Sequence, residues 1–296
     1  MRTILEFIFG FKFRDIIELQ KQVEQMELKL AEANNIITDL QASPVMKLNP
    51  YVTVTSDNRG PLVKLSGLNL QVNNGTGTTC HDANGMGNII IGYDEEYEIN
   101  GNSIPNFCSL GAHTSEEECV AAGGTWATSH KTGSHYLIIG PENNYSGCAG
   151  LVVGMHNTSN GNYASVTGGH GNTASVFGAS VSGGENNNAS GYNASVSGGF
   201  YNHASGEASS ISGGDHNEAT ALSSSVSGGR VNTASGENAS ISGGYTNTAS
   251  GELSSISGGG GGPQTNGNTA SHGLSSILGG ANQSTSTELQ TIPNLP

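Results

Sequence analysis

The chain of 296 residues contains 11% charged residues and 45 glycines, and its net charge is −14. Ordinary globular domains carry about 25% charged residues, and disordered segments usually combine high charge with no periodicity. The negative charge argues against nucleic acids as partners, because their phosphates are bound by lysine and arginine. It also argues against an anionic membrane surface. The composition therefore favours a fold built from regular repeats.

Residues 1–15 form an apolar and aromatic segment interrupted by Glu6, Lys12 and Arg14. Its apolar run is shorter than the roughly 20 residues needed to cross a bilayer, and no A-x-A cleavage site follows it. We therefore expect neither a membrane span nor a secretion signal. We interpret the segment as an attachment segment whose anchors are four alternating aromatic residues, Phe7, Phe9, Phe11 and Phe13.

Residues 16–42 carry a heptad pattern that predicts a coiled coil. Apolar residues recur at alternating spacings of three and four, with Glu, Lys and Gln between them, at Ile16, Leu19, Val23, Met26, Leu30, Ala33, Ile37 and Leu40. This mixture of residues does not fix the number of strands. An amphipathic helix on a globular core is the alternative, and Ser43-Pro44 should end the helix.

Residues 43–87 alternate in a strand-like way and predict short β-strands, with turns at residues 57–60 and 73–75. Residues 88–150 are expected to contain early turns of a solenoid with an insertion between them. Clustered carboxylates at Asp94, Glu95, Glu96 and Glu98 raise the alternative of a calcium site. A solvated acidic loop is the preferred interpretation, and no other cofactor is expected.

The four cysteines suggest two disulfides formed in an oxidising location, because no CxxC pair indicates a metal site. We expect Cys108 to pair with Cys119 across a short loop and Cys80 to pair with Cys148 around it. Four free thiols are the alternative. The phrase TSEEECVAAGGTW further predicts a short helix capped by Thr114 or Ser115.

A repeat of 15 residues dominates residues 151–281, and residues 282–296 are expected to be a C-terminal tail. One position of each repeat is always an apolar β-branched residue, and these residues are Val166, Val181, Val196, Ile211, Val226, Ile241, Ile256 and, after an insertion, Ile277. Six residues after most of them stands an asparagine, and these are Asn172, Asn187, Asn202, Asn217, Asn232 and Asn247. An alanine follows two residues later. Weaker copies begin at Ile90, Ile138 and Val152.

Such a repeat predicts a mainly β parallel solenoid in which each unit adds one turn. The β-branched residues would stack into a core, alanine would fill a narrower second layer, and the asparagines would form a hydrogen-bonded ladder. Paired glycines would permit the corners. One turn buries little apolar surface, so association of three stacks, held in register by the preceding heptad, is expected.

The 15-residue unit SVSGGxxNxASGxxx resembles the head repeat of YadA-like trimeric autotransporter adhesins, whose 14-residue motif runs SVAIGxxSxAxGxx before the Ser of the next repeat. Ser-Val and the fifth-position Gly, tenth-position Ala and twelfth-position Gly match, over about residues 150 to 280. The third and fourth positions differ, Asn replaces the eighth-position Ser, and the unit is one residue longer. The resemblance implies a left-handed parallel β-roll and a homotrimer.

The order of the segments departs from that family, which ends in a membrane-anchoring β-barrel segment, whereas this chain ends in STSTELQTIPNLP. A coiled coil that precedes the head is typical of phage tail fibres and of fibres on contractile injection particles. We therefore expect an extracellular or particle-surface fibre that docks by its N-terminus into a baseplate or shell protein and binds a cell-surface glycan or receptor. A bacterial surface adhesin or matrix protein is the alternative.

No catalytic or metal-ligating residues are predicted, because serine recurs with the repeat and no GxSxG elbow stands between a strand and a helix. An enzyme such as a depolymerase is a distant alternative. His170, His203 and His216 fall at variable positions and should face solvent. Other variable positions suit stacking on sugars, namely Tyr192, Phe200, Tyr201, Arg230 and Tyr245. Alternatively, they cover a neighbouring chain of the trimer.

Overall fold

The computed structural model describes residues 2–48, 50–81, 83–95, 98–99, 102–103, 107–108, 115–121, 124–262 and 266–293, with the backbone alone for residues 2–15, 45, 98–99, 102–103 and 107. The predicted anchors Phe7, Phe9, Phe11 and Phe13 therefore lie outside the described side chains. The chain divides into two units, Met1–Gln71 and Val72–Pro296.

The first unit begins with one long helix, α1 (Arg2–Ala42), followed by a 3-10 helix, η1 (Pro44–Leu48). The helix ends where predicted, because Ser43 N–H bonds back to Leu40 O and Pro44 has no N–H to donate. An antiparallel hairpin follows, with strands β1 (Val52–Asp57) and β2 (Gly60–Leu65). The strand-like alternation also runs through residues 68–72, but these residues form no strand.

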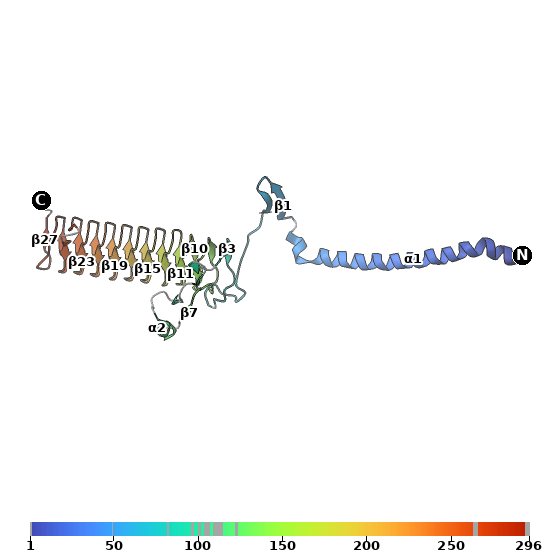
Figure 1. The fold of residues 1–296 in the computed structure, drawn as a ribbon, viewed down its shortest axis with the longest axis horizontal. Helices are drawn as coiled ribbons and strands as arrows, with labels where there is room; N and C mark the ends of the chain where they lie inside the picture. The colour runs from blue at the N-terminus through green and yellow to red at the C-terminus, as the bar shows by residue number, and fades with distance from the viewer. Residues whose placement is uncertain are drawn as a thin grey trace. The chain divides into compact units, whose positions relative to one another are not determined.

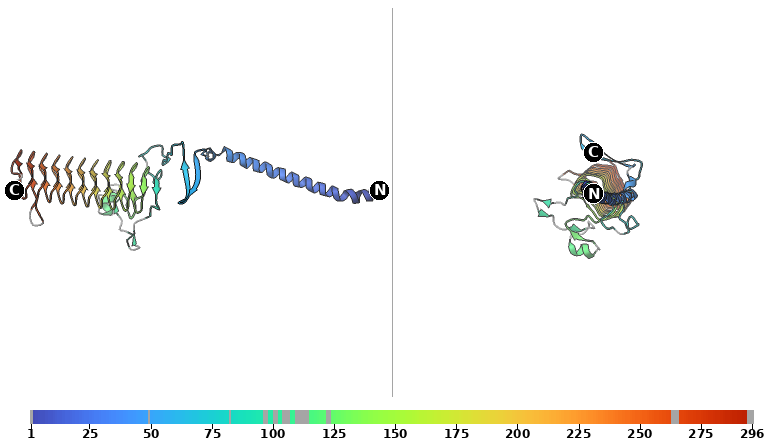
Figure 2. Two further views of the ribbon diagram at one scale, coloured as in Figure 1. Left: turned by 90° about the horizontal axis from the view of Figure 1, so that it is seen from above. Right: turned by 90° about the vertical axis from the view of Figure 1, so that its right-hand side faces the viewer.

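The second unit is a parallel β-solenoid in which each complete turn contributes one short strand to each of two sheets (Figures 1 and 2). The first sheet contains, in spatial order, β3 (Ile89–Ile91), β8 (Leu137–Ile139), β10 (Leu151–Val153), β12 (Ser165–Val166), β14 (Ser180–Val181), β16 (Ser195–Val196), β18 (Ser210–Ile211), β20 (Ser225–Val226), β22 (Ser240–Ile241), β24 (Ser255–Ile256), β26 (Ser276–Ile277) and β27 (Thr291–Ile292).

The second sheet contains the strands that end in the repeated alanine, preceded by two early strands without it. Its strands are β9 (Asn144–Tyr145), β11 (Thr158–Ser159), β13 (Thr173–Ala174), β15 (Asn188–Ala189), β17 (His203–Ala204), β19 (Glu218–Ala219), β21 (Thr233–Ala234), β23 (Thr248–Ala249) and β25 (Thr269–Ala270). We call the loop from a first-sheet strand to the next second-sheet strand the first corner, and the loop that returns the second corner.

The core consists of three stacked columns. The predicted β-branched residues are at most 1% exposed, and the repeated alanines are fully buried. A third column, which was not predicted from the sequence, precedes the first-sheet strands from β12 to β26 and holds either alanine or serine in each turn. It contains Ala164, Ala179, Ala194, Ser209, Ser224, Ala239, Ser254 and Ser275. Each turn therefore buries three small side chains as well as its asparagine.

The early turns follow the predicted register, since Ile90 pairs with Ile138 and Ile138 with Val152. The C-terminal tail was predicted wrongly, because β27 pairs with β26 and adds a further turn. There Gln283 takes the asparagine position and donates its backbone N–H to Asn268 Oδ1 at 3.0 Å. Thr285, only 2% exposed, takes the alanine position. These substitutions hide the last turn from a search for the repeat.

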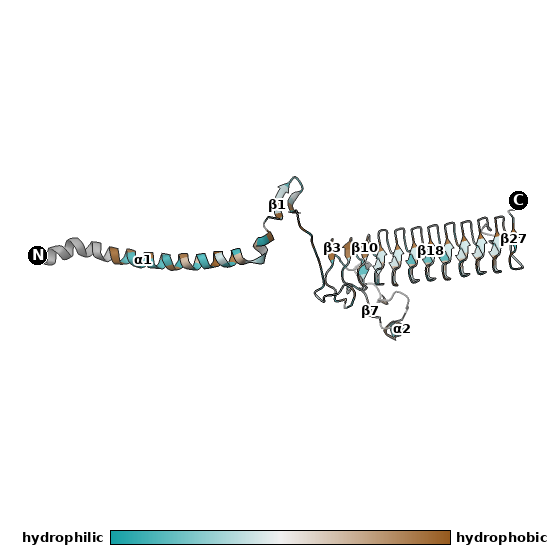
Figure 3. Ribbon diagram, turned by 180° about the vertical axis from the view of Figure 1, so that it is seen from behind, coloured by the Kyte–Doolittle hydropathy of each residue, from teal (hydrophilic) through white to brown (hydrophobic). Residues whose placement is uncertain are grey.

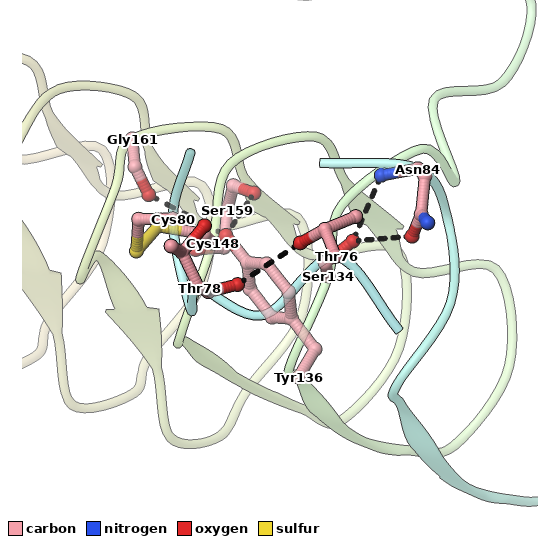
Figure 4. Close-up of a disulfide and its surroundings, with 9 residues drawn as sticks. All are labelled: Thr76, Thr78, Cys80, Asn84, Ser134, Tyr136, Cys148, Ser159 and Gly161. Carbon is pink, nitrogen blue, oxygen red and sulfur yellow. Dashed lines mark hydrogen bonds between the residues drawn. A yellow bond between two sulfur atoms is a disulfide. The ribbon is translucent and has the colours of Figure 1, made fainter. Parts of the chain in front are cut away.

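The insertion lies between β3 and β8 and contains β4 (Glu98–Ile99), β5 (Asn102–Ser103), β6 (Phe107–Cys108), α2 (Glu116–Ala121) and β7 (Trp126–Ala127). Ser115 caps α2, because its Oγ accepts the Glu118 N–H at 3.3 Å. Both predicted disulfides are confirmed. Cys108–Cys119 closes a short loop within the insertion, and Cys80–Cys148 ties the preceding segment to an early turn (Figure 4).

Two tyrosines fill the N-terminal end of the solenoid core, where later turns have alanine. Tyr136 is 2% exposed, and its hydroxyl donates to Ser159 O at 3.1 Å (Figure 4). Tyr145 lies 5.5 Å away, measured between ring centroids. Burial raises the pKa of Tyr136 to about 12. Burial and the nearby Asp94 carboxylate raise the pKa of Tyr145. Both rings stay neutral and fill this part of the core with bulky side chains.

Candidate binding surface

The asparagine ladder holds each turn to the next, through the backbone rather than mainly through side-chain pairs. Asn202 Oδ1 accepts the backbone N–H of Asn217, in the next turn, at 2.9 Å. Its Nδ2 donates to Gly198 O in its own turn and to Gly214 O in the next, both at 3.0 Å. The amide is buried with three hydrogen bonds made, so the ladder fixes the first corners rigidly.

The first corner varies in length, whereas the second does not. Nine residues always separate a ladder position from the next β-branched core position, as from Asn172 to Val181. The separation from a β-branched core position to the ladder position of the same turn varies. It is five residues from Val152 to Asn157 and six residues in most later turns. The extra residue relative to the 14-residue turns therefore lies in the first corner.

Variable residues of the first corner stack directly on one another from turn to turn. Phe200 pairs with Asp215, Asp215 with Arg230 and Arg230 with Tyr245 as parallel bridges. The residue after each has a positive φ, including Tyr201 at 52° and His216 at 54°. Such φ values are uncommon outside glycine, asparagine and aspartate. These residues have a left-handed backbone conformation that their own side chains disfavour. The asparagine ladder therefore stabilises this conformation, in which the bulky side chains point outward.

These residues form one contiguous surface, which we call the corner strip, consisting of Phe200, Tyr201, Asp215, His216, Arg230 and Tyr245. The His216 ring stacks on Tyr201 with centroids 5.1 Å apart, and Tyr201 meets Phe200 edge to face at 4.4 Å. Asp215 contacts both His216, on the aromatic side of the strip, and Arg230, on the other side.

The charged part of the corner strip is built around Asp215. Its Oδ2 lies 2.9 Å from Arg230 Nε, and its Oδ1 lies 2.5 Å from His216 Nδ1. Arg230 also lies over the Tyr245 ring, with Cζ 5.9 Å from the centroid. The Arg230 side chain is 62% exposed, and Phe200 and Tyr201 are 39% and 47% exposed. Aromatic surface, a carboxylate and a guanidinium thus stand side by side in solvent.

Tyr192 does not join the other predicted ligand contacts. It lies at the second corner, where its ring stacks on Phe177 with centroids 4.9 Å apart, and Phe177 meets Tyr163 at 5.2 Å. Conversely, Asp215 is not among the predicted ligand contacts, and His216 was predicted only to face solvent. Counting back 15 residues from Arg230 and from Val231 would have identified both.

Asp94 from the acidic stretch is held by neighbouring side chains. Its Oδ2 accepts the Tyr145 hydroxyl at 3.0 Å, and its Oδ1 lies 3.3 Å from Lys131 Nζ. Among the residues with described side chains, no group of three or more His, Cys, Asp or Glu is placed to hold a metal ion. Of the predicted solvent-facing histidines, His203 contacts Ser190 Oγ at 2.8 Å, and His170 lies beside His156.

The large apolar heptad residues of α1 lie in solvent within the single chain. Figure 3 shows in brown that apolar residues recur along the described part of this helix. Exposed fractions range from 44% at Val23 to 61% at Leu30. Within the part of the chain that the structure describes, no helix has the length and apolarity needed to cross a bilayer. Comparison with models of protein families and with curated proteins finds no match for the chain.

Proposed function

We propose that the chain is a homotrimeric structural fibre that adheres to cells through a glycan or receptor and catalyses no reaction. The exposed heptad stripe of α1 carries this proposal. Seven large apolar side chains along one helix would be costly to leave in water, and copies of the same stripe would bury them in a coiled coil. The heptad segment, residues 16–42, would give a coiled-coil stalk about 40 Å long.

The number of strands is proposed from the repeat. Its likeness to the YadA-like head repeat points to a trimer, and the solenoid of unit 2 supplies a stiff rod suited to a head. Two disulfides fit an extracellular or particle-surface location, where thiols are oxidised. The order of stalk before head favours a phage tail fibre or a contractile injection particle, with residues 1–15 docking into a baseplate or shell protein.

Light scattering of the purified chain tests the assembly, and three chain masses are expected. Val23→Glu combined with Leu30→Glu places like charges in the stripe and should yield single chains at micromolar concentration. Lys21→Glu, on the side of the helix opposite the stripe, is the matched control and should leave the mass unchanged. A monomeric wild-type chain would refute the trimer.

Crosslinking from residues 1–15 in the native assembly tests the carrier. Crosslinks to a baseplate or shell protein would support the particle fibre. Insertion of this segment into lipid would favour the alternative of a bacterial surface adhesin.

A further inference from the structure

We propose that the corner strip binds an uncharged oligosaccharide, and that the fibre therefore adheres through its side. The inference rests on the proposed adhesive function and specifies both the place of contact and the chemical class of the ligand. The strip crosses four successive turns, so at about 4.8 Å per turn it is about 14 Å long. That length suits several linked sugars better than a single one.

The strip offers the two kinds of contact that a pyranose needs. Phe200 and Tyr201 expose aromatic surface on which the apolar C–H face of a sugar ring can pack. Beside them, Asp215 can accept hydrogen bonds from hydroxyl groups and Arg230 can donate to them. Arg230 uses Nε toward Asp215, and within the described residues its two Nη groups make no hydrogen bond. A pair of neighbouring hydroxyls can therefore bridge carboxylate and guanidinium.

The charge of the strip and its surroundings favours a neutral ligand over an acidic one. Arg230 is the only lysine or arginine in residues 132–296, a segment with eight aspartates and glutamates. Asp215 already neutralises that single cation at 2.9 Å. An anionic polysaccharide would therefore meet repulsion from the rest of the rod without a free positive group to offset it.

The position of the insertions indicates that the strip stays accessible when copies associate. The chain leaves the stack after β3 and rejoins the second sheet near Lys131, which pairs with Tyr145, so the insertion that carries α2 and β7 leaves from a first corner. The residues between Ile256 and Asn268 also emerge from a first corner. In the left view of Figure 2, both project from the same side of the stack.

A threefold arrangement brings the same face of every chain to the axis. An insertion that contains α2 and a disulfide could not be accommodated three times at a close-packed axis. The first corners, and the corner strip with them, would then face outward. This reasoning favours ligand contact over the alternative that these aromatic side chains cover a neighbouring chain.

The test uses the full-length chain and a panel of oligosaccharides with neutral members built from glucose, galactose, mannose and N-acetylglucosamine, and acidic members that carry sialic or uronic acid. Titration calorimetry of the best binder follows. Tyr201→Asn copies the residue at the equivalent position of the previous turn, Asn186, and so preserves the backbone. Arg230→Gln removes the guanidinium. Tyr192→Leu, which copies the equivalent Leu222, removes a comparably exposed ring from the second corner and is the matched control.

We expect binding to a neutral oligosaccharide that Tyr201→Asn and Arg230→Gln each weaken about tenfold or more, while Tyr192→Leu changes it less than twofold. Unchanged binding in the strip variants, or loss with Tyr192→Leu, would overturn the location but not the adhesive function. Binding to acidic members alone would overturn the ligand class. Binding to no member would overturn the inference together with the glycan role. Thermal unfolding of each variant verifies that it folds.

Discussion

Adjacent glycines of one repeat should differ sharply in their tolerance of a side chain. At Gly198, a Cβ would have no heavy atom within 4 Å. At Gly199, φ is 92° and a Cβ would lie 2.2 Å from Gly214 O. That carbonyl accepts the Phe200 N–H at 2.9 Å and Asn202 Nδ2 at 3.0 Å. Gly199→Ala must therefore both adopt an unfavourable φ and push the two turns apart.

The expected cost follows from those contacts. A positive φ costs an alanine about 1–2 kcal/mol, and weakening two hydrogen bonds of a buried carbonyl adds about 1–3 kcal/mol. We expect Gly199→Ala to lose about 2–5 kcal/mol, while Gly198→Ala changes the free energy of unfolding by less than about 0.5 kcal/mol. Urea titration followed by far-ultraviolet circular dichroism measures both. Equal stabilities of the two variants would refute the close-packed geometry of the first corner.

Three further changes test other parts of the solenoid. Val231→Asn should raise the unfolding free energy by about 1 kcal/mol, because Val231 has a φ of 54° that a β-branched residue tolerates poorly; a lower urea midpoint would contradict this. Burial and the nearby His170 lower the pKa of His156, so the folded state binds fewer protons below about pH 6.5 and should lose stability on acidification. Thermal midpoints at pH 7.5 and 5.0 should show a smaller difference in His156→Asn than in the wild type, and equal differences would count against the linkage. Replacing Cys80 and Cys148 by alanine opens a loop with a sequence separation of 68 and should cost about 4 kcal/mol, seen as faster hydrogen exchange in the early turns; unchanged exchange would show that this bridge is dispensable.

The repeat could be predicted from sequence because its signal is redundant. The spacing of the β-branched residues fixes the register, and each asparagine stands at one place in it, so the core column and the ladder emerge together. The early turns were also predictable, since Ile138 and Val152 still mark the first sheet although the repeat shortens to 14 residues. The disulfides followed from their positions around the insertion.

The features that could not be predicted involve residue types that occur both on the surface and in the core of this solenoid. Ser209 and Ser224 are fully buried, yet serine is so frequent on the outside of the repeat that this column gave no contrast. Tyr136 and Tyr145 replace small core residues only in the turn that follows β3 and the insertion, so no periodic spacing marks them. The separation of Tyr192 from the corner strip required knowing which loop belongs to which corner.

The variable length of the first corner has a consequence for how such rods diversify. The ladder fixes the register of each turn by a hydrogen bond between successive asparagines. This hydrogen bond persists across the longer loop, where the Asn268 N–H donates to Asn247 Oδ1 at 2.9 Å. Loop length and register are therefore uncoupled at this edge. Foreign loops grafted there should leave the rod intact, so this edge can acquire new recognition elements while the core sequence stays constant.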